Sequence, residues 1–177
     1  QRQMCIRDRP HVEGPAGAEL ENEPPLVDGY VDSWNGGCNS PESGNPFQPI
    51  TGPAFCGKAG YYLDPEGVSS RDTDWFTITV PAGGVLEVNG DAEEGSYMFE
   101  LGPQDCGSVG VLQLVAFGPY NEATMSISGP PGVTVWLWVG PQTFWQGLTY
   151  EYDYVLLLNL ATPVAERSWT AVKALFR

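Results

Sequence analysis

The sequence contains little positive charge and no long apolar run. Its 177 residues include 8 Lys and Arg against 22 Asp and Glu, which gives a formal net charge of −14 at pH 7. Because a protein that binds the phosphates of DNA or RNA needs a basic surface, we expect no binding of nucleic acid. No segment reaches the roughly 18 consecutive apolar residues of a membrane-spanning helix, so we expect no membrane insertion either.

Histidine is almost absent, and this excludes several kinds of active site. His11 is the only histidine and lies in an N-terminal segment without a periodic apolar pattern, so we expect no Ser–His or Cys–His pair of the kind used in nucleophilic catalysis. A zinc site is disfavoured because there is also no Cys-x₂-Cys pair. Carboxylates are numerous enough for a glycosidase pair, but their even spread indicates a solvated acidic face. We therefore expect a protein that is not an enzyme and has no catalytic residues.

Glycine, proline and short apolar segments dominate what the sequence does contain. The 22 Gly and 16 Pro residues predict frequent turns, and segments with strand-like alternation lie between them. The predicted strands cover residues 29–34, 59–63, 74–80, 85–88, 96–101, 111–117, 123–128, 134–139 and 149–158. The Pro-Ala-Gly-Gly stretch at 81–84 predicts a hairpin between the strands on either side of it. The fold class is all-β: a jelly-roll-like β-sandwich of two mostly antiparallel sheets.

The chain divides into four parts. Residues 1–9 resemble the translation of a transposase-type sequencing adapter, so we exclude them and expect the native sequence to continue upstream of Pro10. Residues 10–27, rich in Pro, Gly and Glu, predict a disordered linker. The β-sandwich domain is expected at 28–161. A short C-terminal helix is expected at 162–177, where apolar residues recur at helical spacing.

The most distinctive motif is Asp72-Thr-Asp-Trp-Phe76, which leads through Thr-Ile-Thr-Val into Pro-Ala-Gly-Gly. It resembles the start of the bacterial pre-peptidase C-terminal domain, and a later Gly-Pro-Pro-Gly turn at 129–132 is similar to a second turn of such modules. The resemblance covers residues 29–160. It implies a β-sandwich appended to secreted bacterial proteins, without catalytic residues of its own and without a ligand that could be carried over.

Asp72 and Asp74 admit two interpretations. In the structural one, they cap the turn before the strand that follows. In the functional one, their carboxylates are oxygen ligands for a structural Ca²⁺ ion, and no other cofactor is expected. The further ligands considered are Asp28, Asp32 and Asp153.

Three cysteines remain outside residues 1–9. Cys38 and Cys56 lie 18 residues apart in the least regular region, flanked by glycines, and we expect them to form a disulfide, as in many exported proteins. Three pairings are open. Cys106 would then be a free buried thiol, unless it pairs with one of the other two or with a cysteine outside this sequence.

Aromatic residues suggest an alternative function. Period-2 alternation places Tyr150, Tyr152 and Tyr154 on one face of a strand, while Trp34 and Trp145 lie in turn-rich segments. If exposed, such rings would stack on sugars and form a carbohydrate-binding surface. The candidate binding residues are Trp34, Trp145, Tyr150 and Tyr152. The competing interpretation places these tyrosines beside Trp136 and Trp138 in the core.

These observations predict a non-catalytic accessory module of a secreted or cell-surface bacterial protein, which acts in folding, spacing or adhesion. The alternatives are a carbohydrate-binding module and a Ca²⁺-stabilised β-sandwich. The expected partners are the other domains of the parent secreted protein and, in the carbohydrate-binding alternative, an extracellular polysaccharide.

Overall fold

The structure is a computed structural model that describes residues 12–40, 46–144 and 147–160. The excluded stretch 1–9, the expected helix at 162–177 and Trp145 lie outside the described residues. Within the described ranges, no helix is long and apolar enough to cross a membrane.

The described residues form strands and one 3₁₀ turn, η1 (Gly37–Asn39). The strands are β1 (Glu19–Leu20), β2 (Gln48–Ile50), β3 (Ala54–Leu63), β4 (Ser69–Arg71), β5 (Asp74–Thr79), β6 (Val85–Ala92), β7 (Ser96–Gly102), β8 (Gly110–Phe117), β9 (Ala123–Ser128), β10 (Thr134–Pro141) and β11 (Tyr150–Leu158). Eight of the nine predicted strands are therefore confirmed; β3 and β6 are longer than predicted, and the other six differ by at most two residues at their ends. The strand predicted at 29–34 is wrong, because that segment is irregular.

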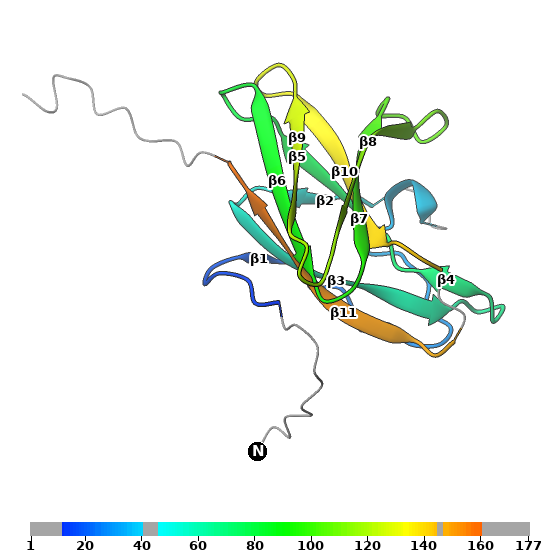
Figure 1. Cartoon of the computed structure of the whole chain (residues 1–177). Coiled ribbons are helices and arrows are strands. Elements are labelled where there is room, and N and C mark those ends of the chain that lie inside the picture. The colour runs from blue at the N-terminus through cyan, green and yellow to red at the C-terminus, as the bar shows by residue number, and fades with distance from the viewer. Residues whose placement is uncertain (1–11, 41–45, 145–146, 161–177) are drawn as a thin grey trace, which may run out of the picture.

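The strands build the two layers of a β-sandwich (Figure 1). The first sheet has the order β1-β3-β11-β6-β9, with β4 also paired to β3, and the second has the order β2-β5-β10-β7-β8. Pairing is parallel between β1 and β3 and between β2 and β5, and antiparallel in the other pairs. The predicted sandwich of mostly antiparallel sheets is confirmed.

The predicted hairpin across residues 81–84 is wrong. Strand β5 pairs with β10 and β2 in the second sheet, whereas β6 pairs with β11 and β9 in the first. The Pro-Ala-Gly-Gly turn therefore carries the chain from one layer to the other. Sequence alternation gives the inward face of each strand but not which strand it pairs with, so a turn signal alone did not distinguish the two connections.

The core lies between the sheets and follows the period of two along each strand. On β11, Leu156 is fully buried while its neighbour Leu157 is 44% exposed. Aromatic and aliphatic side chains from both layers meet there. The largest fully buried side chains are Tyr152, Tyr154, Phe55, Phe76, Phe117, Ile78, Leu86, Met98, Met125, Ile127, Leu137 and Leu156.

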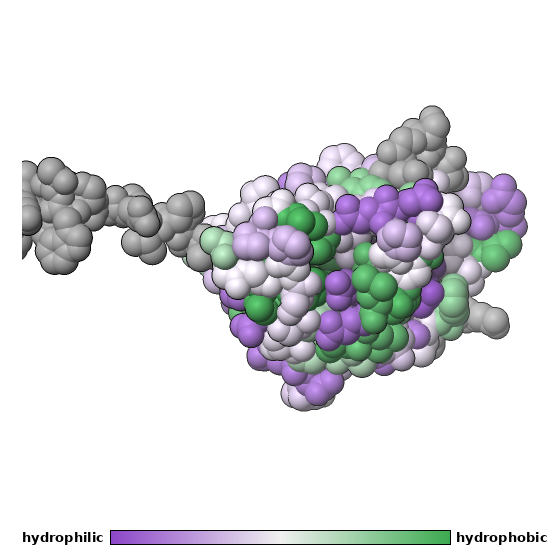
Figure 2. All heavy atoms as spheres, turned by 90° about the horizontal axis from the view of Figure 1, so that it is seen from above, coloured by the Kyte–Doolittle hydropathy of each residue, from purple (hydrophilic) through white to green (hydrophobic). Residues whose placement is uncertain are grey.

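A second apolar cluster covers the outer face of the second sheet. It contains Trp75, Leu101 and Trp138, with Trp136 packed against it. Trp138 stacks on Phe99 at a centroid distance of 4.5 Å. Trp136 and Trp138 therefore do not share the central core with the tyrosines, because Leu137 lies between them and occupies the inward position. At the end of the sandwich seen in Figure 2, hydrophobic and hydrophilic residues alternate in small patches.

The segment predicted as a disordered linker at 10–27 is ordered where the structure describes it. Strand β1 pairs with β3, and its register places Leu20 opposite Cys56. Leu26 and Glu21 are both buried. Because the segment contains few apolar residues, its sequence did not predict that Glu21 and Leu26 pack against the sandwich.

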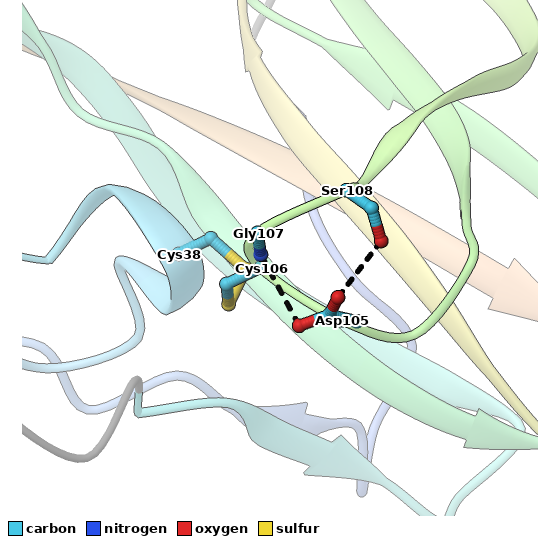
Figure 3. Close-up of a disulfide and its surroundings, with 5 residues drawn as sticks. All are labelled: Cys38, Asp105, Cys106, Gly107 and Ser108. Carbon is cyan, nitrogen blue, oxygen red and sulfur yellow. Dashed lines mark hydrogen bonds between the residues drawn. A yellow bond between two sulfur atoms is a disulfide. The ribbon is translucent and has the colours of Figure 1, made fainter.

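The disulfide joins Cys38 to Cys106, and Cys56 is a free thiol. The predicted pair of Cys38 and Cys56 is wrong because the two residues belong to different layers: Cys56 is on β3 of the first sheet, while η1 with Cys38 contacts β5 of the second. The partner comes from the loop after β7 (Figure 3), in which Asp105 accepts hydrogen bonds from Gly107 and Ser108. The disulfide thus fastens the η1 segment onto the outer face of the second sheet.

We expect the double variant Cys38→Ser/Cys106→Ser to unfold more easily than the native chain. The disulfide spans 68 residues, and a loop of that size is worth about 4 kcal/mol in the chain-entropy model. Urea unfolding followed by fluorescence measures the loss. The matched control, Cys56→Ser, keeps the disulfide and should change the free energy of unfolding by much less; equal losses in the two variants would contradict the observed pairing.

Candidate metal centre

Five carboxylates from separate segments of the chain converge at one edge of the sandwich. Glu21 and Glu23 follow β1, Asp32 precedes η1, and Asp72 and Asp74 lie just before and at the start of β5. Glu21, Glu23 and Asp74 form one group, and Glu23, Asp32 and Asp72 form another; within each group one oxygen per residue lies within 4.8 Å of the others. The two groups share Glu23, and we call the five residues together the acidic cluster.

Burial sets the acidic cluster apart from ordinary surface acids. Asp74 is fully buried, Asp72 is 1% exposed, and Glu21 and Asp32 are 4% and 5% exposed. Acidic side chains are almost never buried to this degree unless a cation or several hydrogen-bond donors compensate the charge. The compensation available within the protein therefore decides what the cluster can do.

Hydrogen bonds satisfy part of the acidic cluster. The Glu21 carboxylate accepts bonds from the Lys58 backbone N–H at 2.7 Å and from the Asn35 side-chain amide at 2.8 Å. Asp74 Oδ2 accepts a bond from the Tyr154 hydroxyl at 2.8 Å. The Tyr30 hydroxyl donates to Glu23.

Several buried oxygens remain without a donor. Asp32 Oδ1, Asp72 Oδ1 and Asp74 Oδ1 have no hydrogen-bond partner, and neither does Oδ1 of the neighbouring Asn35. Native proteins satisfy the great majority of buried polar atoms. Several orphaned acceptors at one place would therefore be stabilised by a cation or by a proton.

No basic side chain of the described residues compensates the charge. Lys58 directs its ammonium group to Glu151, with an N···O distance of 3.7 Å. Arg71 donates from Nη1 to the Pro141 carbonyl at 2.9 Å and stacks on aromatic rings. The acidic cluster thus combines converging carboxylates, burial and a lack of internal cations.

The pKa values respond accordingly. Burial is the largest cause in every case, and it raises the pKa of Asp32 to about 6, of Glu21 to about 7 and of Glu23 to about 8. The pKa values of Asp72 and Asp74 also lie well above the usual range, because burial and the neighbouring carboxylates both disfavour ionisation. At neutral pH and without a cation, some carboxyl groups of the acidic cluster are therefore protonated, and those that are ionised repel one another.

The donor set fits a hard divalent cation. All the ligand atoms offered by the two groups are carboxylate oxygens, which Ca²⁺ prefers, whereas zinc and copper sites use histidine or cysteine. Ca²⁺ binds oxygens at roughly 2.3–2.6 Å, so oxygens on opposite sides of one ion lie about 5 Å apart. The separations within each group match that spacing, and the orphaned oxygens would gain a partner.

Sequence reasoning identified part of the acidic cluster. Asp72 is grouped with Asp32, one of the three further ligands considered, whereas Asp74 belongs to the other group, and only Glu23 is common to both. Asp28 instead accepts a hydrogen bond from Thr149, and neither it nor Asp153 belongs to either group.

Glu21 and Glu23 were missed because they lie in the segment predicted as a linker. Two acidic residues at i and i+2, preceded by Leu20 and followed by Leu26, were the available signal.

The predicted row of tyrosines lies on one face of β11, but that face is buried. Tyr152 is 2% exposed and its hydroxyl bonds to Ser96, so it cannot bind a ligand at the surface. Tyr150 is half-buried, and Trp34 is 46% exposed with its indole N–H bound to the Glu21 carbonyl. The alternation was read correctly, but the face that carries the tyrosines is the inner one.

No family model matches the chain, and no curated protein matches it. The features that bear on function are therefore the acidic cluster and the fold.

In EDTA, we expect the midpoint of thermal unfolding to fall as the pH is raised from 5 to 8. Carboxylates whose pKa is raised on folding contribute stability that is fully present below their unfolded pKa of about 4 and is lost as the pH rises through the folded values, here about 6 to 8. Melts followed by circular dichroism at constant ionic strength measure the slope. A midpoint that stays level or rises over this range would show that the carboxylates are not buried together.

Proposed function

We propose that the chain is a non-catalytic, Ca²⁺-stabilised accessory module of an exported protein. The observation that carries this proposal is the set of orphaned carboxylate oxygens on Asp32, Asp72 and Asp74, buried where no basic side chain of the described residues reaches. A divalent cation in each of the two groups would give these oxygens a partner and compensate the charge of the acidic cluster.

Ca²⁺ fits better than Mg²⁺. Ca²⁺ accepts six to eight oxygens in flexible geometry, while Mg²⁺ requires a compact octahedron and retains several waters. Each group offers up to six carboxylate oxygens from three residues, and those of Glu21 and Asp74 are already oriented by Asn35, Lys58 and Tyr154. A crowded and largely dry donor set of this kind favours the larger ion.

An ion bound in either group would act on the fold by joining segments that are remote in sequence. Glu21 and Glu23 come from the edge segment after β1, Asp32 from the connection to η1, and Asp72 and Asp74 from the entry to β5 in the second sheet. Neutralising their mutual repulsion holds these segments against the sandwich. The module then offers a rigid body for folding, spacing or adhesion.

Export is supported by two features. A disulfide is typical of proteins that fold in an oxidising compartment, and the chain has one between Cys38 and Cys106. The motif from Asp72 to Gly84 resembles a module of secreted bacterial proteins. The proposed partners are the other domains of such a parent protein.

We expect Ca²⁺ to bind the native chain and to raise its unfolding midpoint, because a ligand that binds only the folded state stabilises it. Titration calorimetry of the EDTA-treated, dialysed protein measures binding, and melts at pH 8 with Ca²⁺ or EDTA measure the shift. Mg²⁺ at the same concentration should give a smaller shift. Added Ca²⁺ should also remove the loss of stability between pH 5 and 8.

The matched variants are Asp74→Asn and Asp28→Asn. Both remove one charge with little change of shape, but Asp74 belongs to the acidic cluster while Asp28 is exposed and outside it. Asp74→Asn should weaken Ca²⁺ binding at least about tenfold, the scale of one charge-assisted contact, and Asp28→Asn should leave it unchanged. Absence of both heat and stabilisation in the native protein would overturn the metal site.

A further inference from the structure

A hollow of about 630 Å³ lies beside the acidic cluster, between the connection after β1 and the β3–β4 hairpin. Asp32 belongs both to the acidic cluster and to its wall. Aromatic rings and polar groups alternate around it. The lining residues used here are Tyr30, Tyr62, Asp64, Glu66, Arg71 and Phe144.

Phe144 is the most exposed ring of this hollow, with 67% of its surface accessible. The Arg71 guanidinium lies 3.9 Å from the ring centroid and supports it from one side. The same ring lines a second hollow of about 460 Å³, together with Leu63 and Val68. Phe144 therefore lies between the two hollows, and the Arg71 guanidinium packs against one face of its ring.

Tyr30 and Tyr62 form the opposite aromatic element. Their rings meet edge to face at a centroid distance of 5.2 Å, and Tyr62 is largely buried. The Asp64 carboxylate holds the hairpin turn by accepting bonds from the backbone of Glu66 and Val68. The walls of the hollow are thus fixed by packing and hydrogen bonds.

The charges around the hollow disfavour an anion, and Arg71 already occupies a face of Phe144 on which a cation would bind. Asp32, Asp64 and Glu66 would repel an anionic ligand. A cationic ligand would meet Arg71, which already occupies a face of Phe144. Aromatic faces combined with fixed hydrogen-bonding groups suit a ligand that is neutral, has apolar ring faces and carries many hydroxyl groups.

We propose that these two hollows bind a neutral polysaccharide, with one sugar ring stacked on Phe144 and neighbouring units in the hollows on either side. The site differs from the aromatic residues selected from the sequence, of which Tyr152 is buried. The aromatic ring supplies contact area, and the hydroxyl, amide and carboxylate groups of the walls bind the sugar hydroxyls.

One part of this inference rests on the proposed Ca²⁺ site. Asp32 lines the hollow, and Tyr30 donates to Glu23 of the acidic cluster. An ion bound there would fix both residues and hence one wall of the hollow. Saccharide binding should therefore be stronger with Ca²⁺ than with EDTA.

Affinity electrophoresis of the full chain in native gels tests the site, with hydroxyethylcellulose, xyloglucan and glucomannan as neutral probes and polygalacturonate and polylysine as charged ones. We expect at least one neutral polysaccharide to retard the native protein. Phe144→Ala should weaken this retardation at least about tenfold, as expected for a central aromatic contact. Phe144→Trp, which keeps a stacking surface, should retain it.

Tyr120→Ala is the matched control, because Tyr120 is 90% exposed and lines neither hollow; it should behave as the native protein does. The proposal is overturned if no neutral probe retards the protein, if only polygalacturonate or polylysine does, or if Phe144→Ala binds as the native chain does. Ca²⁺ titration of Phe144→Ala should match the native protein, so a failure of the saccharide site and a failure of the metal site give different results. Retardation that depends on Phe144 but not on Ca²⁺ would keep the saccharide site and reject its coupling to the metal.

Discussion

The constraint on which this structure depends is the burial of several carboxylates in a place without an internal cation. Asp72 precedes and Asp74 begins β5, which is paired on both sides in the second sheet, so these two side chains cannot move to solvent without disturbing β5. Glu21, Glu23 and Asp32 face them from the edge segment. Either protons or a cation must compensate this charge, and the choice between them sets how stability depends on pH and on metal.

The disulfide and the acidic cluster act on the same stretch of chain. Residues 32–39 carry Asp32, the buried amide of Asn35 and Cys38. The Trp75 backbone N–H donates to the Asn35 carbonyl, and Asn39 donates to Thr73, so this stretch is also tied to the entry of β5. Its position is therefore determined by a covalent link at one end and by electrostatics at the other.

Sequence reasoning predicted the elements of this fold better than their connections. Alternation located the longer strands because each has one inward face, as Leu156 and Leu157 illustrate. It could not show that β5 and β6 lie in different sheets, nor that Cys38 meets Cys106, since both facts depend on long-range packing. Three of the five residues of the acidic cluster, Asp72, Asp74 and Asp32, were visible in the sequence, but Glu21 and Glu23 gain their role only when β1 pairs with β3.

If the proposed function is correct, the disulfide and the bound Ca²⁺ ion that hold residues 32–39 would both form only outside the cell. Disulfides form in oxidising compartments, and extracellular modules bind Ca²⁺ with dissociation constants of about 10⁻⁴–10⁻³ M, which cytosolic Ca²⁺ does not saturate. Before export, the acidic cluster would be self-repelling at neutral pH and Cys38 would be reduced, so the edge segment would be held weakly. After export, the ion would hold this stretch at Asp32 and the disulfide would hold it at Cys38. Because Asp32 also lines the hollow beside Phe144, that wall of the hollow would become rigid as well.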